Sequence, residues 1–136
     1  MSTKVNPELL ARIKGLKLKD ISEVQPDILV PLPNKQQDTD YVIEVRTEEF
    51  TSLCPLSLQQ PDYATIVIKY KPKDRIVELK SLKLYFVSFR NTQIFHEDIP
   101  ATILKDLVAL LSPKEMTITG YFTIRGGLKT TVEAKI

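Results

Sequence analysis

Apolar and polar residues alternate with a period of two in several parts of the chain, which is the pattern of half-buried β-strands. The clearest case is Met116–Ile124, in which apolar residues and a glycine face one side and threonines and a tyrosine face the other. The stretch Thr51–Pro61 holds two prolines and is predicted to be a loop. The predicted strands are Tyr41–Phe50, Tyr63–Tyr70, a short Arg75–Leu79, Met116–Ile124 and Leu128–Ile136.

The period changes to that of an α-helix in the middle of the chain. In Lys80–Arg90 the apolar residues follow the i, i+3, i+4, i+7 spacing of an amphipathic helix. A second helix is predicted over Asp98–Leu111, with Pro100 in its first turn and Ser112-Pro113 ending it.

The first 40 residues carry weaker signals. Helical spacing is faint in Pro7–Lys17, and Gln25–Thr39 holds three prolines, which indicates an extended arm or a loop. We therefore predict an N-terminal extension over residues 1–40 and a single folded domain over residues 41–136.

The order of the main elements, ββααββ, predicts an α+β fold with a four-stranded antiparallel sheet. Two helices can cover only one face of such a sheet, and the outer strands keep free edges. We expect these edges to pair between copies of the chain, giving a closed homo-oligomer with active sites between subunits. The alternative is a monomeric α+β sandwich whose edge is covered by the N-terminal arm.

Composition narrows the class of protein. The formal charge is only +2, from 19 basic and 17 acidic residues, which argues against a protein that binds nucleic acid through a basic face. No apolar run is long enough for a membrane span, and Met1–Lys19 has no signal-peptide core. A single cysteine fits the cytoplasm. With one histidine and one cysteine, no zinc site of nitrogen and sulfur ligands is expected within one chain.

Cys54 is the only cysteine, and Asp62 follows it by eight residues. A lone thiol is either an inert apolar core residue or a nucleophile. The prolines around Cys54 and a carboxylic acid within reach as a proton donor favour the nucleophile.

Other polar residues are candidates for binding. Lys80 and Lys83 lie one helical turn apart and, together with Arg125, are suited to a phosphate group; alternatively they are a solvated helix face and part of a hairpin turn. His96-Glu97 precedes the second helix, so Glu97 is either a helix cap or a carboxylate for a guanine-like edge, where it accepts from an N–H and an NH₂ group.

Six short motifs follow one another between Phe50 and Gly127. They are Phe50-Thr51-Ser52-Leu53-Cys54-Pro55, Gln60-Pro61-Asp62-Tyr63-Ala64-Thr65-Ile66, Glu78-Leu79-Lys80-Ser81-Leu82-Lys83-Leu84-Tyr85, Ser88-Phe89-Arg90-Asn91, Phe95-His96-Glu97 and Arg125-Gly126-Gly127. Together they closely resemble the 7-cyano-7-deazaguanine reductases, the NADPH-dependent nitrile reductases of queuosine biosynthesis. The short chain resembles the unimodular type of this family.

The resemblance implies a tunnelling fold (T-fold) like that of GTP cyclohydrolase I, assembled into rings or barrels. It implies that Cys54 is the nucleophile, which forms a thioimidate with the nitrile, and that Asp62 is the general acid. The resemblance assigns the deazaguanine pocket to Val77, Glu78, Leu79, His96 and Glu97. It assigns the NADPH phosphates to Lys80, Lys83 and Arg125.

Two departures and two rival functions accompany this resemblance. The stretch between Cys54 and Asp62 is one residue longer than the family's usual run and lacks its glycine, and Leu79 replaces a frequent serine.

A T-fold amidinotransferase acting on the same nitrile in archaeal transfer RNA would share Cys54, Asp62 and Glu97 but not the lysine helix. A non-enzymatic oligomeric binding protein would leave Cys54 inert.

Overall fold

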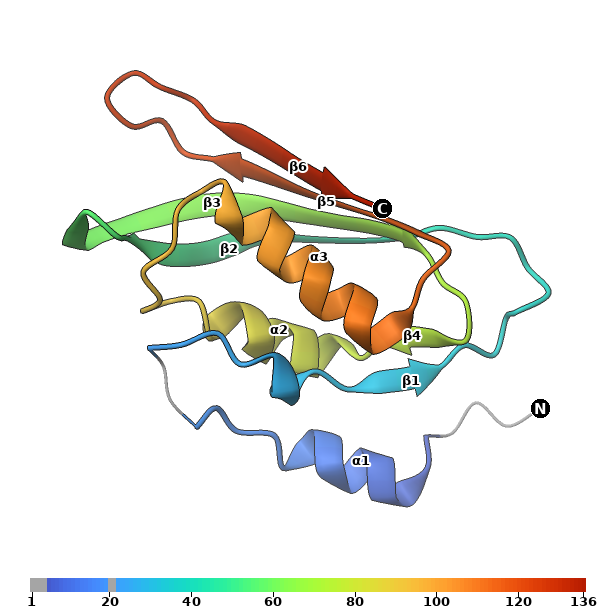
Figure 1. Cartoon of the computed structure of the whole chain (residues 1–136). Coiled ribbons are helices and arrows are strands. Elements are labelled where there is room, and N and C mark those ends of the chain that lie inside the picture. The colour runs from blue at the N-terminus through green and yellow to red at the C-terminus, as the bar shows by residue number, and fades with distance from the viewer. Residues whose placement is uncertain (1–4, 20–21) are drawn as a thin grey trace.

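A four-stranded antiparallel sheet forms the centre of the computed structural model, which describes residues 5–19 and 22–136 (Figure 1). Its strand order is β2-β3-β5-β6, so β2 and β6 are the outer strands. The strands are β2 (Ile43–Cys54), β3 (Ser57–Lys71), β5 (Glu115–Phe122) and β6 (Thr131–Lys135). This arrangement confirms the predicted α+β fold and its four-stranded antiparallel sheet.

Two helices cover one face of the sheet, as predicted (Figure 1). They are α2 (Leu79–Val87) and α3 (Asp98–Leu111), and the bounds of α3 are those predicted from its apolar stripe. The core lies between these helices and alternate residues of the strands, because successive strand residues point to opposite faces. Fully buried side chains from both layers include Ile66, Ile68, Tyr85, Phe89, Ile103, Leu107 and Ile118.

The helix α2 begins at Leu79 because Glu78 caps it. The Glu78 carboxylate accepts hydrogen bonds from the backbone N–H groups of Lys80, at 2.7 Å, and Ser81, at 2.6 Å. The short strand β4 (Arg75–Val77) therefore ends two residues earlier than predicted, since Glu78 and Leu79 belong to the start of the helix.

The stretch Thr51–Pro61 is not the predicted loop. Strand β2 continues to Cys54 and β3 begins at Ser57, leaving only a tight turn between them. The proline Pro61 is tolerated because its strand partner Leu53 makes its backbone hydrogen bonds elsewhere: it donates to Thr92, at 2.9 Å, and accepts from Ile94, at 3.1 Å. Pro61 therefore removes no hydrogen bond from the pairing of β2 with β3.

The N-terminal segment lies beside α2, on the side of this helix that faces away from the sheet (Figure 1). The segment contains α1 (Pro7–Lys14), the 3-10 helix η1 (Pro26–Ile28) and β1 (Pro31–Pro33), which pairs antiparallel with β4. Residues 28–30 are buried, whereas α1 buries none of its residues. The boundary predicted at residue 40 stays a prediction, although β1 and the buried residues tie part of the extension to the body of the domain. In residues 5–19 and 22–136, none of the helices has the length and apolar character needed to span a bilayer.

Candidate active site

The hairpin of β2 and β3 carries both Cys54 and Asp62. Asp62 pairs with Ser52 across the hairpin, and Cys54 is the last residue of β2, two positions beyond Ser52. Cys54 is half-buried, and Asp62 is buried, with 5 % of its surface exposed. The register slips between Leu53 and Cys54, so residues 58–60 bulge from β3 between the two candidate groups.

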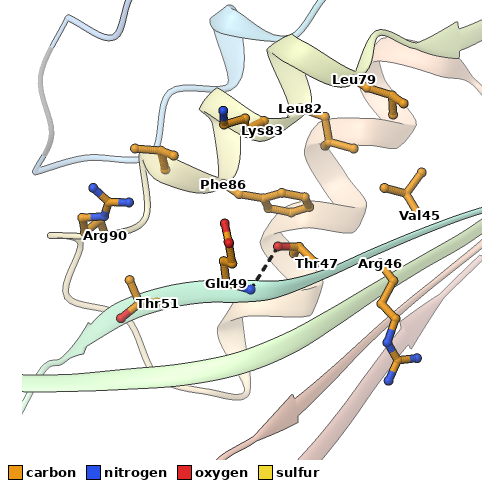
Figure 2. A pocket seen from close by; sticks show the side chains of 11 residues that line it. Val45, Arg46, Thr47, Glu49, Thr51, Leu79, Leu82, Lys83, Phe86 and Arg90 are labelled. Carbon is orange, nitrogen blue, oxygen red and sulfur yellow. Dashed lines mark hydrogen bonds between the residues drawn. The ribbon is translucent and has the colours of Figure 1, made fainter.

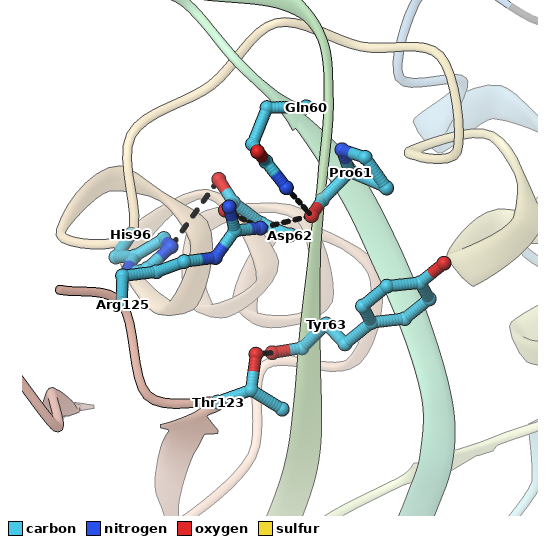
Figure 3. Close-up of polar contacts among 7 residues, drawn as sticks. All are labelled: Gln60, Pro61, Asp62, Tyr63, His96, Thr123 and Arg125. Atoms are coloured by element: carbon cyan, nitrogen blue, oxygen red, sulfur yellow. Dashed lines mark hydrogen bonds and ion pairs between the residues drawn. The ribbon is translucent and has the colours of Figure 1, made fainter. Parts of the chain in front are cut away.

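Asp62 is held from two sides (Figure 3). His96 Nε2 lies 3.2 Å from Asp62 Oδ2, and Arg125 Nη2 lies 2.7 Å from Asp62 Oδ1. The same Arg125 nitrogen donates to the backbone carbonyl of Pro61. A buried carboxylate is stable only when its oxygens have partners, and these two side chains supply them.

His96 reaches Asp62 because the segment after α2 runs alongside the end of β2. Leu53 forms a parallel bridge with Gln93, three residues before His96. The imidazole then stacks on the buried ring of Phe122, with the ring centroids 4.0 Å apart and the planes at 8°. This stack fixes the plane of the His96 ring, so that its Nε2 faces the carboxylate.

Arg125 is placed by a two-residue turn after β5. Arg125 and Leu128 exchange backbone hydrogen bonds of 2.9 and 2.8 Å. Gly126 and Gly127 lie between Arg125 and Leu128. Their φ angles are 55° and 80°, which residues with a side chain rarely adopt. The tight turn predicted at these glycines is confirmed, although β6 begins only at Thr131.

The residues predicted to line the deazaguanine pocket have different surroundings. Val77 is buried and donates its N–H to the Tyr70 hydroxyl, at 3.2 Å, while the Glu78 carboxylate caps α2. Leu79 is 61 % exposed. Glu97 is exposed at the start of α3, and its side chain makes no capping hydrogen bond there. Glu97 thus occupies the N-cap position of α3, but its carboxylate accepts none of the helix's N–H groups.

The three basic side chains that were predicted to bind phosphate have different neighbours. Lys80 Nζ donates to the carbonyls of Ile13, at 3.0 Å, and Lys14, at 3.2 Å, at the end of α1. Lys83 lines a groove between α2 and β2, and Arg125 contacts Asp62. Within the described residues, no recorded contact joins Arg125 to either lysine.

The groove beside Lys83 has a volume of about 280 Å³ (Figure 2). Arg90 also lines it, next to the apolar side chains of Leu82 and Phe86, whereas the Arg46 side chain points to the other side of β2, where its Nε lies 3.4 Å from Glu48 Oε1 (Figure 2). A dinucleotide combines anionic phosphates with flat rings, so cations beside apolar surface suit it, although Glu49 adds one negative charge to the lining.

Sequence reasoning missed several residues of these two sites. Arg90 is the last residue of the predicted helix but received no role, and it lies beyond the observed end of α2 at Val87. Phe122 belongs to an alternating apolar face, which identifies a core residue but not a histidine stacked upon it. Only the long-range pairing of β5 with β3 brings Phe122 to the site.

Comparison with known proteins gives a consistent result. The family model described as "QueF-like protein" matches residues 61–136. A protein of Thermomicrobium roseum named NADPH-dependent 7-cyano-7-deazaguanine reductase is 53 % identical over 104 residues, covering 76 % of this chain and 80 % of the relative. A Helicobacter pylori protein of the same name is 47 % identical over 124 residues, covering 91 % of this chain and 83 % of the relative.

A solved structure shares the fold. The apo form of the archaeosine synthase QueF-Like matches with a TM-score of 0.64, covering 69 % of this chain and 91 % of that one. The sequence identity is 22 %, so this likeness shows the T-fold alone and does not favour the transfer-RNA alternative.

Proposed function

This chain belongs to the family of QueF-like proteins, and we propose that it reduces 7-cyano-7-deazaguanine to 7-aminomethyl-7-deazaguanine with NADPH in queuosine biosynthesis. The observation that carries the proposal is the β2–β3 hairpin, which holds a half-buried thiol and a buried carboxylic acid in a chain 53 % identical to a protein named as this reductase. The alternative function, amidinotransfer to the nitrile in transfer RNA, has no relative of comparable identity among those described above.

Cys54 acts on the nitrile carbon in this proposal. Its sulfur bonds to that carbon, one electron pair of the carbon–nitrogen triple bond moves to nitrogen, and nitrogen takes a proton from Asp62. The proton lost by the thiol restores Asp62, so forming the thioimidate consumes no net proton. NADPH, when bound, would supply two hydrides per nitrile, the first to the thioimidate carbon on Cys54 and the second to the imine that follows. After the first reduction the nitrogen lone pair would form an imine as the carbon–sulfur bond breaks, which frees the Cys54 thiolate; the second reduction would then convert this imine to the amine product.

Base recognition is assigned to residues near the same hairpin. The Glu97 carboxylate, which accepts no hydrogen bond from the N–H groups of α3, is available to accept from the N–H and NH₂ groups of a deazaguanine. We propose that Val77, Glu78, Leu79 and His96 line the pocket around that base. Because Glu78 already accepts two backbone hydrogen bonds, its part is to fix the start of α2 beside the substrate.

The cofactor is assigned to the groove beside α2. Lys83 and Arg90 line it, so these two side chains would hold the phosphates of NADPH. Lys80 would join them only after leaving the carbonyls at the end of α1. Arg125 is proposed with them on family resemblance, but its guanidinium is engaged by Asp62 in this chain.

The proposal includes assembly and location. The outer strands β2 and β6 provide edges through which copies of the chain would pair, and the active sites would lie between subunits. We propose a cytoplasmic homo-oligomer that binds the free base and NADPH, with no membrane and no nucleic acid as partners.

The test is NADPH oxidation by the purified protein given free 7-cyano-7-deazaguanine. We expect two NADPH per nitrile, and without NADPH a protein mass increased by that of the substrate. Cys54→Ala should fold and abolish both signals, with Cys54→Ser as a conservative control. No NADPH loss, together with conversion of nitrile-bearing transfer RNA in ammonium, would assign the protein to the amidinotransferase alternative.

A further inference from the structure

We propose that Arg125 is a positioning residue for the addition step: it holds Asp62 so that a single carboxyl oxygen is left to exchange the proton. This inference rests on the proposed function and deepens it, because it concerns the same thiol addition to the nitrile. It gives Arg125 a role that does not involve the cofactor.

The geometry separates the two oxygens of Asp62. Arg125 Nη2 lies 2.7 Å from Oδ1 and also donates to the carbonyl of Pro61, the residue before Asp62 (Figure 3). A guanidinium keeps its charge and has no acceptor, so it neither gives up nor receives a proton at Oδ1. The oxygen left for proton exchange is Oδ2, which faces His96 Nε2 at 3.2 Å.

The position of Arg125 is built into the fold. Beyond the last paired residues of β3 and β5, the backbone N–H of Thr123 donates to the Tyr63 carbonyl, at 3.0 Å, which extends the contact of the two strands toward the site. The glycine turn then fixes Arg125 through its two hydrogen bonds with Leu128. The arginine therefore reaches Asp62 from a rigid hairpin end.

The contact requires an arginine and not only a positive charge. One nitrogen serves both the Asp62 side chain and the Pro61 backbone, so the guanidinium locks the carboxyl group relative to its own strand. A lysine is a point charge on a flexible stem and does not reproduce the planar geometry. The Arg125 side chain remains 32 % exposed, so small molecules in solution can reach its site.

The experiment measures the rate at which the thioimidate forms on Cys54 without NADPH, by mass spectrometry of the intact protein at timed intervals. Misplacing a reacting group by about 1 Å costs roughly 10²-fold, and we expect Arg125→Ala to slow adduct formation by about that factor. Added guanidinium ion should restore part of the rate, which it would not do if the variant were merely less stable. Lys129→Ala removes an exposed cation from the same loop and is the matched control, with an unchanged rate.

Arg125→Lys keeps the charge and gives a second test where the alanine variant folds poorly. We expect it to fold and to form the adduct about tenfold more slowly than wild type, since it lacks the planar contact. A wild-type adduct rate in Arg125→Lys, or in folded Arg125→Ala with weakened NADPH binding, would overturn the inference and leave Arg125 as a phosphate ligand. Absence of the adduct in the wild-type protein would instead refute the proposed function itself.

Discussion

Gly120→Ala should disturb the active site from a position that contacts neither Asp62 nor Cys54. Gly120 is buried in β5, and an ideal Cβ built on it lies 2.8 Å from Phe122 Cε2 and 3.3 Å from Pro100 Cγ. Phe122 is the ring on which His96 stacks. The added methyl group therefore pushes on the support of the histidine that contacts Asp62.

The size of the effect follows from these distances. The Phe122 ring must retreat from 2.8 Å to at least 3.4 Å, the beginning of ordinary contact, while it is 2 % exposed and has neighbours behind it. Overpacking of this kind typically costs about 1–3 kcal/mol of unfolding free energy. Because the rings of Phe122 and His96 are only 4.0 Å apart, the imidazole shifts with the phenyl ring and lengthens its 3.2 Å contact with Asp62. A displacement approaching 1 Å would slow adduct formation on Cys54 by up to about 10²-fold.

Two measurements on the variant check this reasoning: urea unfolding and the cofactor-free rate of adduct formation. The control is Phe122→Leu, alone and combined with Gly120→Ala, because leucine removes the ring atoms nearest to the added methyl group. In the leucine background Gly120→Ala should cost less stability than in wild type, a non-additivity expected for groups in contact. A Gly120→Ala variant within about 0.5 kcal/mol of wild type, on the scale of ordinary surface changes, and with an unchanged adduct rate would refute the argument.

Two further predictions concern the lysines and one half-buried carboxyl group, that of Asp106. Lys83→Ala should raise the KM for NADPH more than Lys80→Ala, because Lys83 lines the groove while Lys80 binds the end of α1; equal effects in steady-state kinetics would contradict this. Burial raises the pKa of Asp106 above its ordinary value of 3.8, although a hydrogen bond from Tyr85 opposes the shift. The stability that this raised pKa contributes is present below about pH 3.8 and is lost as the pH rises through the folded-state pKa. Asp106→Asn should therefore gain stability relative to wild type in urea unfolding as the pH rises from 4 to 7, and a relative loss would contradict the sign.

The sequence predicted the helical layer and the central strands well because their patterns are local. The bounds of α3 follow from a continuous apolar stripe with a proline in the first turn and Ser112-Pro113 at the end, where Ser112 adopts φ 45°. The alternation in Met116–Ile124 likewise identified β5. The hairpin at Thr51–Pro61 was predicted wrongly because prolines indicate loops unless a strand partner needs no hydrogen bond from them. That condition depends on Thr92 and Ile94, which lie far along the chain.

The candidate site shows the same limit. Family motifs named Cys54, Asp62, His96 and Arg125, but spacing does not reveal which of these side chains meet. His96 follows Asp62 by 34 residues and Arg125 follows it by 63, and only the strand pairing brings them to one carboxylate. The helical period correctly placed Lys80 and Lys83 one turn apart on α2. It could not show that the end of α1 lies against Lys80, because a periodic pattern defines a face of a helix and not its neighbour.

The resemblance to the reductases predicts one extra residue between Cys54 and Asp62, and the register of the hairpin indicates where that residue is accommodated. Ser52 remains opposite Asp62, and the irregularity begins only beyond Leu53 and Pro61, where residues 58–60 bulge. Asp62 is also anchored from outside the hairpin, by His96 and Arg125 on separate segments. An insertion placed in the bulge therefore leaves the carboxyl group and its two partners in position. The insertion instead changes the bulge between Ser57 and Pro61, next to Cys54, so its consequence for catalysis should be sought in the approach of the thiol and not in the supply of the proton.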